Sequence, residues 1–269
     1  MTYTWLAHSS EIPRLYWGSM RTRFLEYGIA IAVVSFLFPG AAAQVLGSAN
    51  SFAVLGGSAI TNTGNTSLTG DVGTSPGTTI TGLAPGSIIG VVHAGDPVAA
   101  QAMADATIAY NTIANEAFTY DLTGQDLGGL TLLPGVYRFA ASAFLTGTVT
   151  LNAEGDAHAR FDFEIGSTLI TANNSSVRLE NGGEGGNVYW QVGSSATIGS
   201  HTAFIGNVLA SASITMANGA TNLDGRLIAQ SAAISLDSNT IRANATREPA
   251  TLLVLTPMCL ALLKRRKHR

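Results

Sequence analysis

A short sequence phrase recurs in the C-terminal half of this chain, at intervals of about 17–20 residues, a period typical of solenoids. Its clearest copies are residues 194–199 (SSATIG), 211–216 (SASITM) and 231–236 (SAAISL). In each copy small hydroxyl residues alternate with apolar residues, as in a β-strand with one buried face. Stacked copies place their outward side chains in ranks about 4.7–4.9 Å apart. The repeat therefore predicts a β-solenoid with a flat, nearly uncharged surface, which suits a repetitive partner better than a small substrate.

The composition indicates one folded domain. Of the 269 residues, 46% are hydrophobic and 12% are charged, whereas disordered chains combine low hydrophobicity with high charge. The single cysteine, Cys259, excludes an intramolecular disulfide and a cysteine-based metal site. Residues 44–247 hold six arginines against 14 acidic residues, a net charge near −8. They therefore lack the basic stripe that nucleic-acid binding needs.

The N-terminal end has the pattern of an export signal. Arg21 and Arg23 precede an apolar run at residues 28–38, which is followed by three alanines at residues 41–43. A charged region, an apolar region and an A-x-A site form a signal peptide, and this apolar run is too short to span a bilayer. We expect residues 1–43 to be the signal peptide; with Met20 as the start, residues 1–19 are an upstream extension. The alternative is a buried N-terminal helix.

The C-terminal end has the pattern of a second sorting signal. Glu248-Pro249, an apolar stretch at residues 252–263 and a basic cluster at 264–267 resemble the PEP-CTERM signal of Gram-negative bacteria. Arg247 stands where that motif commonly has another proline, and Pro257 interrupts the apolar stretch. The resemblance implies that a sorting enzyme removes residues 248–269 at the membrane and releases or attaches the protein. The alternative is a simple membrane anchor.

The middle of the chain predicts one coil, one loop and one helix. Residues 51–73 are expected to form a first coil, and the Gly-, Pro- and Thr-rich residues 74–95 a loop. Asp96-Pro97 then opens a helix, with Asp as N-cap and Pro at the first position, that runs to about Tyr120. Small residues at three- and four-residue steps predict close packing against a β wall; this stripe comprises Val98, Ala102, Ala106, Ala109, Ile113 and Ala117.

From Gly135 onward, coils of three short strands are expected. One aligned set is residues 160–165, 187–192, 205–209 and 225–228; the second is the repeated phrase; the third contains Val177, Phe204, Thr221 and Ile241. In the second set Leu169, Ala196, Ala212 and Ala232 are expected to point inward, since a one-residue slip would expose every apolar side chain. The outward residues are then Thr168, Ile170, Ser195, Thr197, Ser211, Ser213, Thr215, Ser231, Ala233 and Ser235. An ordinary solvated wall is the alternative, but such walls usually carry Lys, Glu and Asp, which this one lacks.

The residues offer little evidence of a catalytic site or a metal site. Residues 73–77 (GTSPG) fit the G-x-S-x-G pattern of hydrolases, but Pro76 has no N–H for an oxyanion hole, so a turn is expected. His93, His158 and His201 lack ligand spacing and are expected in loops or on the surface. Asp162 and Glu164 face one side of a strand, a weak signal for calcium or glycoside chemistry; Arg226 is expected to pair with Asp224. We therefore expect no enzyme, no cofactor and no metal.

Six segments, read in order from Leu46 to Ala243, closely resemble the microbial ice-binding (antifreeze) protein family. They are residues 46–55 (LGSANSFAVL), 70–77 (GDVGTSPG), 121–130 (DLTGQDLGGL), 190–193 (WQVG), 206–210 (GNVLA) and 237–241 (DSNTI). The resemblance implies a discontinuous β-solenoid, of all-β class, with one long α-helix packed alongside. It also implies a first coil inserted among the later coils.

For function, the resemblance implies adsorption to the surface of ice through one flat solenoid face. The inserted coil adds Ala59, Thr61 and Thr63 to that face, and the next coil adds Ser142 and Thr146. Phe144 and Ile170 depart from a strict Thr-x-Thr rank, and the short segment between Gly82 and Asp96 predicts no capping subdomain. We expect residues 44–247 to be a secreted, monomeric ice-binding domain. The alternative function is a cell-surface or biofilm-matrix structural protein without ice activity.

Overall fold

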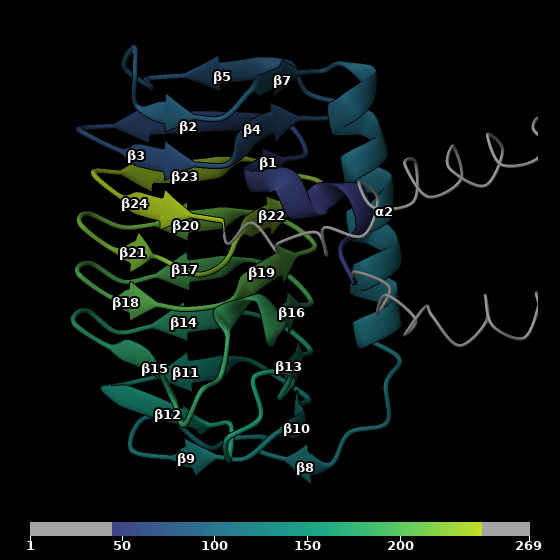
Figure 1. Cartoon of the computed structure of the whole chain (residues 1–269), viewed down its shortest axis with the longest axis vertical. Helices are drawn as coiled ribbons and strands as arrows, with labels where there is room; N and C mark the ends of the chain where they lie inside the picture. The colour runs from purple at the N-terminus through teal and green to yellow at the C-terminus, as the bar shows by residue number, and fades with distance from the viewer. Residues whose placement is uncertain (1–44, 244–269) are drawn as a thin grey trace, which may run out of the picture. The chain divides into compact units, whose positions relative to one another are not determined.

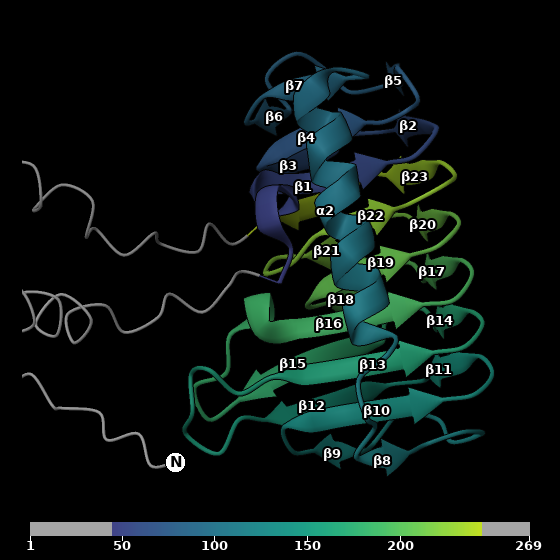
Figure 2. The same cartoon turned by 90° about the vertical axis from the view of Figure 1, so that its right-hand side faces the viewer.

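In the computed structural model, residues 45–243 are described, and they form a solenoid of three parallel β-sheets with one long helix along one side (Figures 1 and 2). This confirms the predicted solenoid and its helix. The expected signal peptide (residues 1–43) and sorting signal (residues 248–269) lie outside the described residues. Among residues 45–243, no helix is both long and apolar enough to cross a membrane.

Sheet A has nine strands and is the wall on which the helix lies. Neighbouring strands pair in parallel throughout the sheet. In spatial order the strands are β7 (Val92–Ala94), β4 (Asp71–Thr74), β1 (Phe52–Gly56), β22 (Leu227–Ala229), β19 (Asn207–Ala210), β16 (Val188–Val192), β13 (Phe161–Ile165), β10 (Gly135–Phe139) and β8 (Tyr120–Asp121). The first predicted strand set is thereby confirmed.

Sheets B and C complete each coil. Sheet B runs in the order β11 (Ala143–Leu145), β14 (Leu169–Thr171), β17 (Ala196–Ile198), β20 (Ile214–Met216), β23 (Ile234–Asp237), β2 (Ala59–Thr63) and β5 (Thr79–Thr81). Sheet C runs in the order β6 (Ile88–Ile89), β3 (Ser67–Thr69), β24 (Thr240–Arg242), β21 (Thr221–Asn222), β18 (Ala203–Phe204), β15 (Ser176–Glu180), β12 (Thr148–Asn152) and β9 (Thr131–Leu132). Two 3-10 turns, η1 (Gly47–Ser51) and η2 (Gly185–Asn187), precede β1 and β16.

The first coil is inserted between the last coil and the coil that follows it in sequence. Strands β1, β2 and β3 pair with β22, β23 and β24 on one side and with β4, β5 and β6 on the other. Figure 1 shows this as the purple-blue strands stacked against the yellow-green ones. The insertion implied by the family resemblance is confirmed.

One sequence prediction about strands is wrong. Residues 74–95 are not a loop: they contain β5, β6 and β7, which close one end of the solenoid. The third predicted strand set is confirmed as sheet C, whose strands contain Val177, Phe204, Thr221 and Ile241. Within it Thr221 pairs with Ala203 and Thr240, and Asn222 occupies the row of Phe204 and Ile241. Asn222 is buried, and its Nδ2 donates to the Gly206 carbonyl at 2.9 Å. An inward asparagine whose side-chain amide N–H bonds the backbone breaks the apolar alternation that marks a buried row in the sequence.

The helix α2 (Pro97–Ile113) begins as predicted and ends earlier. Asp96 Oδ1 accepts a hydrogen bond from the Ala99 backbone N at 2.9 Å, as an N-cap does. The expected end at Tyr120 is wrong, because the chain turns after Ile113 to pair β8 with β10. The buried stripe also differs at its ends, since Val98 is exposed and Ala117 is exposed beyond the helix. The stripe comprises Ala99, Ala102, Ala106, Ala109 and Ile113.

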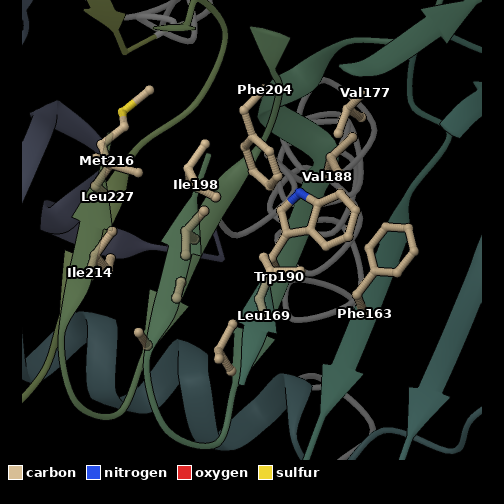
Figure 3. Close-up of a cluster of buried hydrophobic side chains, with 14 of the residues drawn as sticks. Phe163, Leu169, Val177, Val188, Trp190, Ile198, Phe204, Ile214, Met216 and Leu227 are labelled. Atoms are coloured by element: carbon tan, nitrogen blue, oxygen red, sulfur yellow. The ribbon is translucent and has the colours of Figure 1, made fainter. Parts of the chain in front are cut away.

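Inside the solenoid, aromatic side chains stack in a row from coil to coil. The rings of Phe163 and Trp190 lie 3.8 Å apart between centroids and nearly parallel, and Tyr137 extends the stack on the side of Phe163. Phe204, in the same coil as Trp190, meets the indole at a tilt of 47°. Figure 3 shows Trp190 between Phe163 and Phe204 in the interior. The indole N–H of Trp190 donates to the Ile205 carbonyl at 3.0 Å, so this large ring is buried without an unpaired donor.

Candidate functional site

Sheet B presents an alternation of buried and exposed side chains in register across its strands. The inward row is buried in every strand from β11 to β2 and consists of Ala143, Leu169, Ala196, Ile214, Ile234 and Ile60. The next residue of each strand points outward, and these residues form the central row: Phe144, Ile170, Thr197, Thr215, Ser235, Thr61 and Thr81. Parallel pairing spaces the members of this row about 4.7–4.9 Å apart.

A second outward row, the flanking row, lies two residues before the central row. The backbone ladder continues through it, as in the bond from Ala196 N to Ser213 O at 2.9 Å. Hydroxyl groups of neighbouring coils bond to each other here: Ser142 Oγ lies 2.7 Å from Thr168 Oγ1, and Ser195 Oγ lies 2.9 Å from Ser213 Oγ. The flanking row consists of Ser142, Thr168, Ser195, Ser213, Ala233, Ala59 and Thr79. We call the two rows together the sheet B face.

The sheet B face is electrically neutral. Neither row contains an acidic or basic residue, so the expected lack of charge is confirmed for these positions. The nearest carboxylates lie at its margin. Asp126 Oδ1 accepts from the backbone N and the hydroxyl of Thr146, at 3.0 and 2.9 Å, and Asp237 pairs with Thr63 at the end of β23. A neutral plane bounded by fixed hydroxyls can offer both methyl and hydroxyl groups to a partner.

The structure brings most of the predicted face residues together. Thr63 and Thr146 lie at the margin, one step beyond the central row toward sheet C. The two rows hold Ala59, Thr61, Ser142, Thr168, Ile170, Ser195, Thr197, Ser213, Thr215, Ala233 and Ser235.

Ser211 and Ser231 are placed differently. Both lie in the turn from sheet A to sheet B, where Ser211 Oγ donates to the Gly193 carbonyl at 2.7 Å and Ser231 Oγ to the Ser211 carbonyl at 2.6 Å. They therefore bind the turns of successive coils to each other. Ala212 and Ala232 lie in the same turns and are partly exposed, so the prediction that they point inward is wrong.

Thr79 and Thr81 belong to the sheet B face and were missed in the sequence. Both are exposed on β5 and continue the rows of Ala59 and Thr61. The prolines and glycines around them favoured a loop. The available signal was the short alternation Thr79-Ile80-Thr81, because Ile80 packs on the core.

The other two sheets offer different surfaces. Helix α2 covers part of sheet A (Figure 2), where its alanine stripe packs with Leu55, Leu209 and Ile228. Sheet C carries its own row of small residues, from Thr148 through Ser176, Ala203, Thr221 and Thr240 to Ser67. Exposed Arg178 and Arg242 stand beside that row on sheet C. Sheet B thus presents two neighbouring outward rows without charge, whereas charged side chains stand beside the outward row of sheet C.

Residues that suggested other chemistry lie in turns or have a structural partner. Ser75 lies in the turn between β4 and β5, as predicted for GTSPG. His158 and His201 are exposed in turns, but His93 is partly buried on β7, with its Nδ1 2.7 Å from Asp96 Oδ2. Within residues 45–243, no group of three or more His, Cys, Asp or Glu side chains is arranged to hold a metal ion.

One of the two expected charge clusters bonds differently from the prediction. Asp162 pairs with Arg160, whose Nε lies 2.8 Å from Asp162 Oδ2. Arg226 does not form the expected ion pair with Asp224: its Nε donates to the Asn50 carbonyl at 2.8 Å and its Nη1 to Asn207 Oδ1 at 2.9 Å. Asp224 Oδ2 accepts from the Gly185 backbone N at 2.6 Å. Burial lowers the pKa of Arg226 to about 10.

Comparison with known proteins identifies the family. The ice-binding-like family model matches residues 54–242. An ice-binding protein of Nostoc sp. (strain HG1) is 48% identical over 222 residues, which cover 80% of this chain and 82% of the relative. A crystal structure of an ice-binding protein from an Antarctic biological consortium is 42% identical, with a TM-score of 0.71 and coverage of 76% of this chain and 93% of that one. The ice-binding protein of the Antarctic ascomycete Antarctomyces psychrotrophicus is 40% identical, with a TM-score of 0.70 and coverage of 74% and 97%. This chain belongs to the ice-binding-like family.

Proposed function

We propose that this protein binds ice through the sheet B face. The observation that carries the proposal is the central row, where five consecutive strands, β17, β20, β23, β2 and β5, each present one Thr or Ser hydroxyl in register. The relatives named as ice-binding proteins support the same function. The partner is the crystal surface itself, whose repeating lattice matches a repeating protein surface.

The mechanism follows from rigidity and mixed polarity. Backbone ladders hold the plane, and hydroxyl–hydroxyl bonds in the flanking row restrain side chains, so little conformational entropy is lost on adsorption. Methyl groups of the threonines order nearby water, while their hydroxyls anchor that water in register with the lattice. Phe144 and Ile170 are 46% and 39% exposed and make one end of the face apolar. The hydroxyl end, from Thr197 to Thr81, is the part suited to hold ordered water.

A bulky substitution tests the face, with a matched control on the same coil. Thr215 lies on β20 in the central row, and Thr221 lies on β21 in sheet C. In the full chain, Thr215→Tyr should abolish ice shaping and thermal hysteresis, because a ring lifts the plane off the crystal. Thr221→Tyr should leave both unchanged. Circular dichroism and melting would verify folding of each variant. Full activity in folded Thr215→Tyr would show that ice does not bind on sheet B.

We further infer that the protein acts without catalysis, as a secreted monomer. The signal-peptide pattern at residues 1–43 supports export, and the pattern at residues 248–269 supports transient contact with a sorting enzyme and the membrane. The ice crystal is then the partner of residues 44–247, and no cofactor or nucleic acid is required.

A further inference from the structure

The first coil joins the solenoid at a place where chain connectivity does not set the strand register. Strand β2 pairs with β23, although Thr61 and Ser235 are 174 residues apart in sequence. From β11 to β23, in contrast, each strand of sheet B follows its neighbour after one coil of chain. We call the β2–β23 junction the seam. A slip of two residues there would keep the same face outward but would move Thr61 and Thr81 along the strand direction by about 6.6 Å.

Three buried polar side chains lie beside the seam, at the turn from sheet B to sheet C, and one hydrogen bond among them crosses it. Thr66 Oγ1 accepts from the Asn239 backbone N at 3.0 Å and donates to Asn62 Oδ1. Asn239 Nδ2 donates to the Ala217 carbonyl at 2.9 Å, on the side of β20. Asn62 Nδ2 donates to the Gly82 carbonyl at 2.9 Å, on the side of β5. The three side chains, which are 1–8% exposed, therefore link four successive coils.

These hydrogen bonds depend on the register because each partner occupies one fixed position. A slipped first coil would leave the buried Asn239 N–H without its Thr66 acceptor, which is costly. We propose that Thr66 is a positioning residue: its hydroxyl accepts the Asn239 backbone N–H and so fixes the register of the first coil, which aligns Thr61 and Thr81 with Ser235 and Thr215. The effect on ice rests on the proposed function, whereas the alignment itself does not.

A matched position lies away from the seam. The residues just before each sheet C strand form one column, which includes Ser175, Thr202, Asn239 and Thr66. Thr202 is fully buried, and its Oγ1 donates to the Ala172 carbonyl at 3.0 Å. It joins coils that are consecutive in sequence. Thr202→Val therefore removes a comparable buried hydroxyl without touching the seam.

The test compares Thr66→Val, Thr66→Ser and Thr202→Val in the full chain. Thermal hysteresis is measured well below the unfolding temperature of each variant, where its circular dichroism spectrum matches that of the wild type. Nuclear Overhauser contacts between the backbones of Thr61 and Ser235 report the register. Thr66→Val should lose these contacts and most of the hysteresis, and Thr66→Ser should retain both. Thr202→Val should melt at a lower temperature with both retained. Thr66→Ala, which removes the same seam acceptor, replaces Thr66→Val if that variant fails to fold.

Two results would overturn the proposal. Intact contacts and hysteresis in folded Thr66→Val would show that the seam needs no hydroxyl there. Equal loss of hysteresis in Thr202→Val would show that any buried hydroxyl of this column matters, and that Thr66 has no special role. If the wild type has no hysteresis, the proposed function fails, and the Thr61–Ser235 contacts in Thr66→Val alone decide the register claim.

Discussion

At the scale of single residues, Asp162 is a buried carboxyl group whose ionisation is linked to folding. Burial raises its pKa to about 7, against the attraction of Arg160, and the charge of Glu116 adds to the rise. Arg160 lies between the two acids, with Nη2 2.8 Å from Glu116 Oε1 and Nε 2.8 Å from Asp162 Oδ2. The cluster ties the segment after α2 to β13, so these residues contribute to packing.

The raised pKa of Asp162 gives a prediction for pH. Between the unfolded pKa near 3.8 and the folded pKa of about 7, the folded protein holds a proton that the unfolded chain releases. The contribution of Asp162 to stability is therefore fully present below pH 3.8 and is lost as pH rises toward 7. In melting curves across this range, Asp162→Asn should show a smaller fall of melting temperature with pH than the wild type. The control is Asp121→Asn, which should not reduce this fall. Hydrogen bonds from Thr123 lower the pKa of that exposed carboxyl, so its shift is opposite to that of Asp162. Identical pH slopes in Asp162→Asn and wild type would contradict this linkage.

At the scale of elements, the contact between α2 and sheet A depends on alanine. Four alanines and Ile113 form the buried stripe of the helix, and they meet Leu55, Leu209 and Ile228 of three adjacent strands. Side chains of one carbon let the helix axis approach the sheet closely, so even small additions would meet packed atoms. The N-cap at Asp96 and the bond from Ser48 Oγ to Asp105 Oδ2, at 2.6 Å, fix the helix at its start and middle.

The prediction at this scale concerns a charged side chain introduced into the buried stripe of α2. Ala106→Glu should destabilise the protein by several kcal/mol, because it buries an unpaired carboxylate in a tightly packed layer. Thermal unfolding followed by circular dichroism would measure the effect. Ala104→Glu, at an exposed position two residues away, should change the melting temperature little. Equal melting temperatures for the two variants would mean that the alanine stripe does not pack against sheet A.

At the scale of the whole molecule, we expect both ends of the chain to be removed. The mature protein should begin near Gln44 and should lack the residues beyond about Pro249. The apolar segment 252–263 is too short to span a bilayer stably, and the basic cluster after it would hold it on the cytoplasmic side during transit. Intact-mass measurement of protein recovered from the native host would show the processed ends. A mass that still includes Cys259 in the medium or cell-surface fraction would instead indicate an anchored form.

The sequence alone determined the features that depend on near neighbours. Alternation of hydroxyl and apolar residues in the repeats predicted strands with one buried side, because side chains of a strand alternate between its faces. Asp96-Pro97 predicted the start of α2, because an N-cap acts within three residues. The lack of charged residues in the repeats predicted a neutral surface. The inserted first coil was expected only through the family resemblance.

Tertiary structure decided the features that depend on distant partners. Thr79 and Thr81 became part of the sheet B face because β2 lies beside β5, and Ser211 and Ser231 were assigned to the turns because their hydroxyls bond carbonyls of neighbouring coils. Asn222 points inward because the Gly206 carbonyl accepts from it. The seam joins residues 174 positions apart, and its register depends on buried hydrogen bonds that exist only after the coils have stacked. Local periodicity therefore specifies each coil, whereas contacts between coils decide which coils are neighbours and which hydroxyls stand in one row.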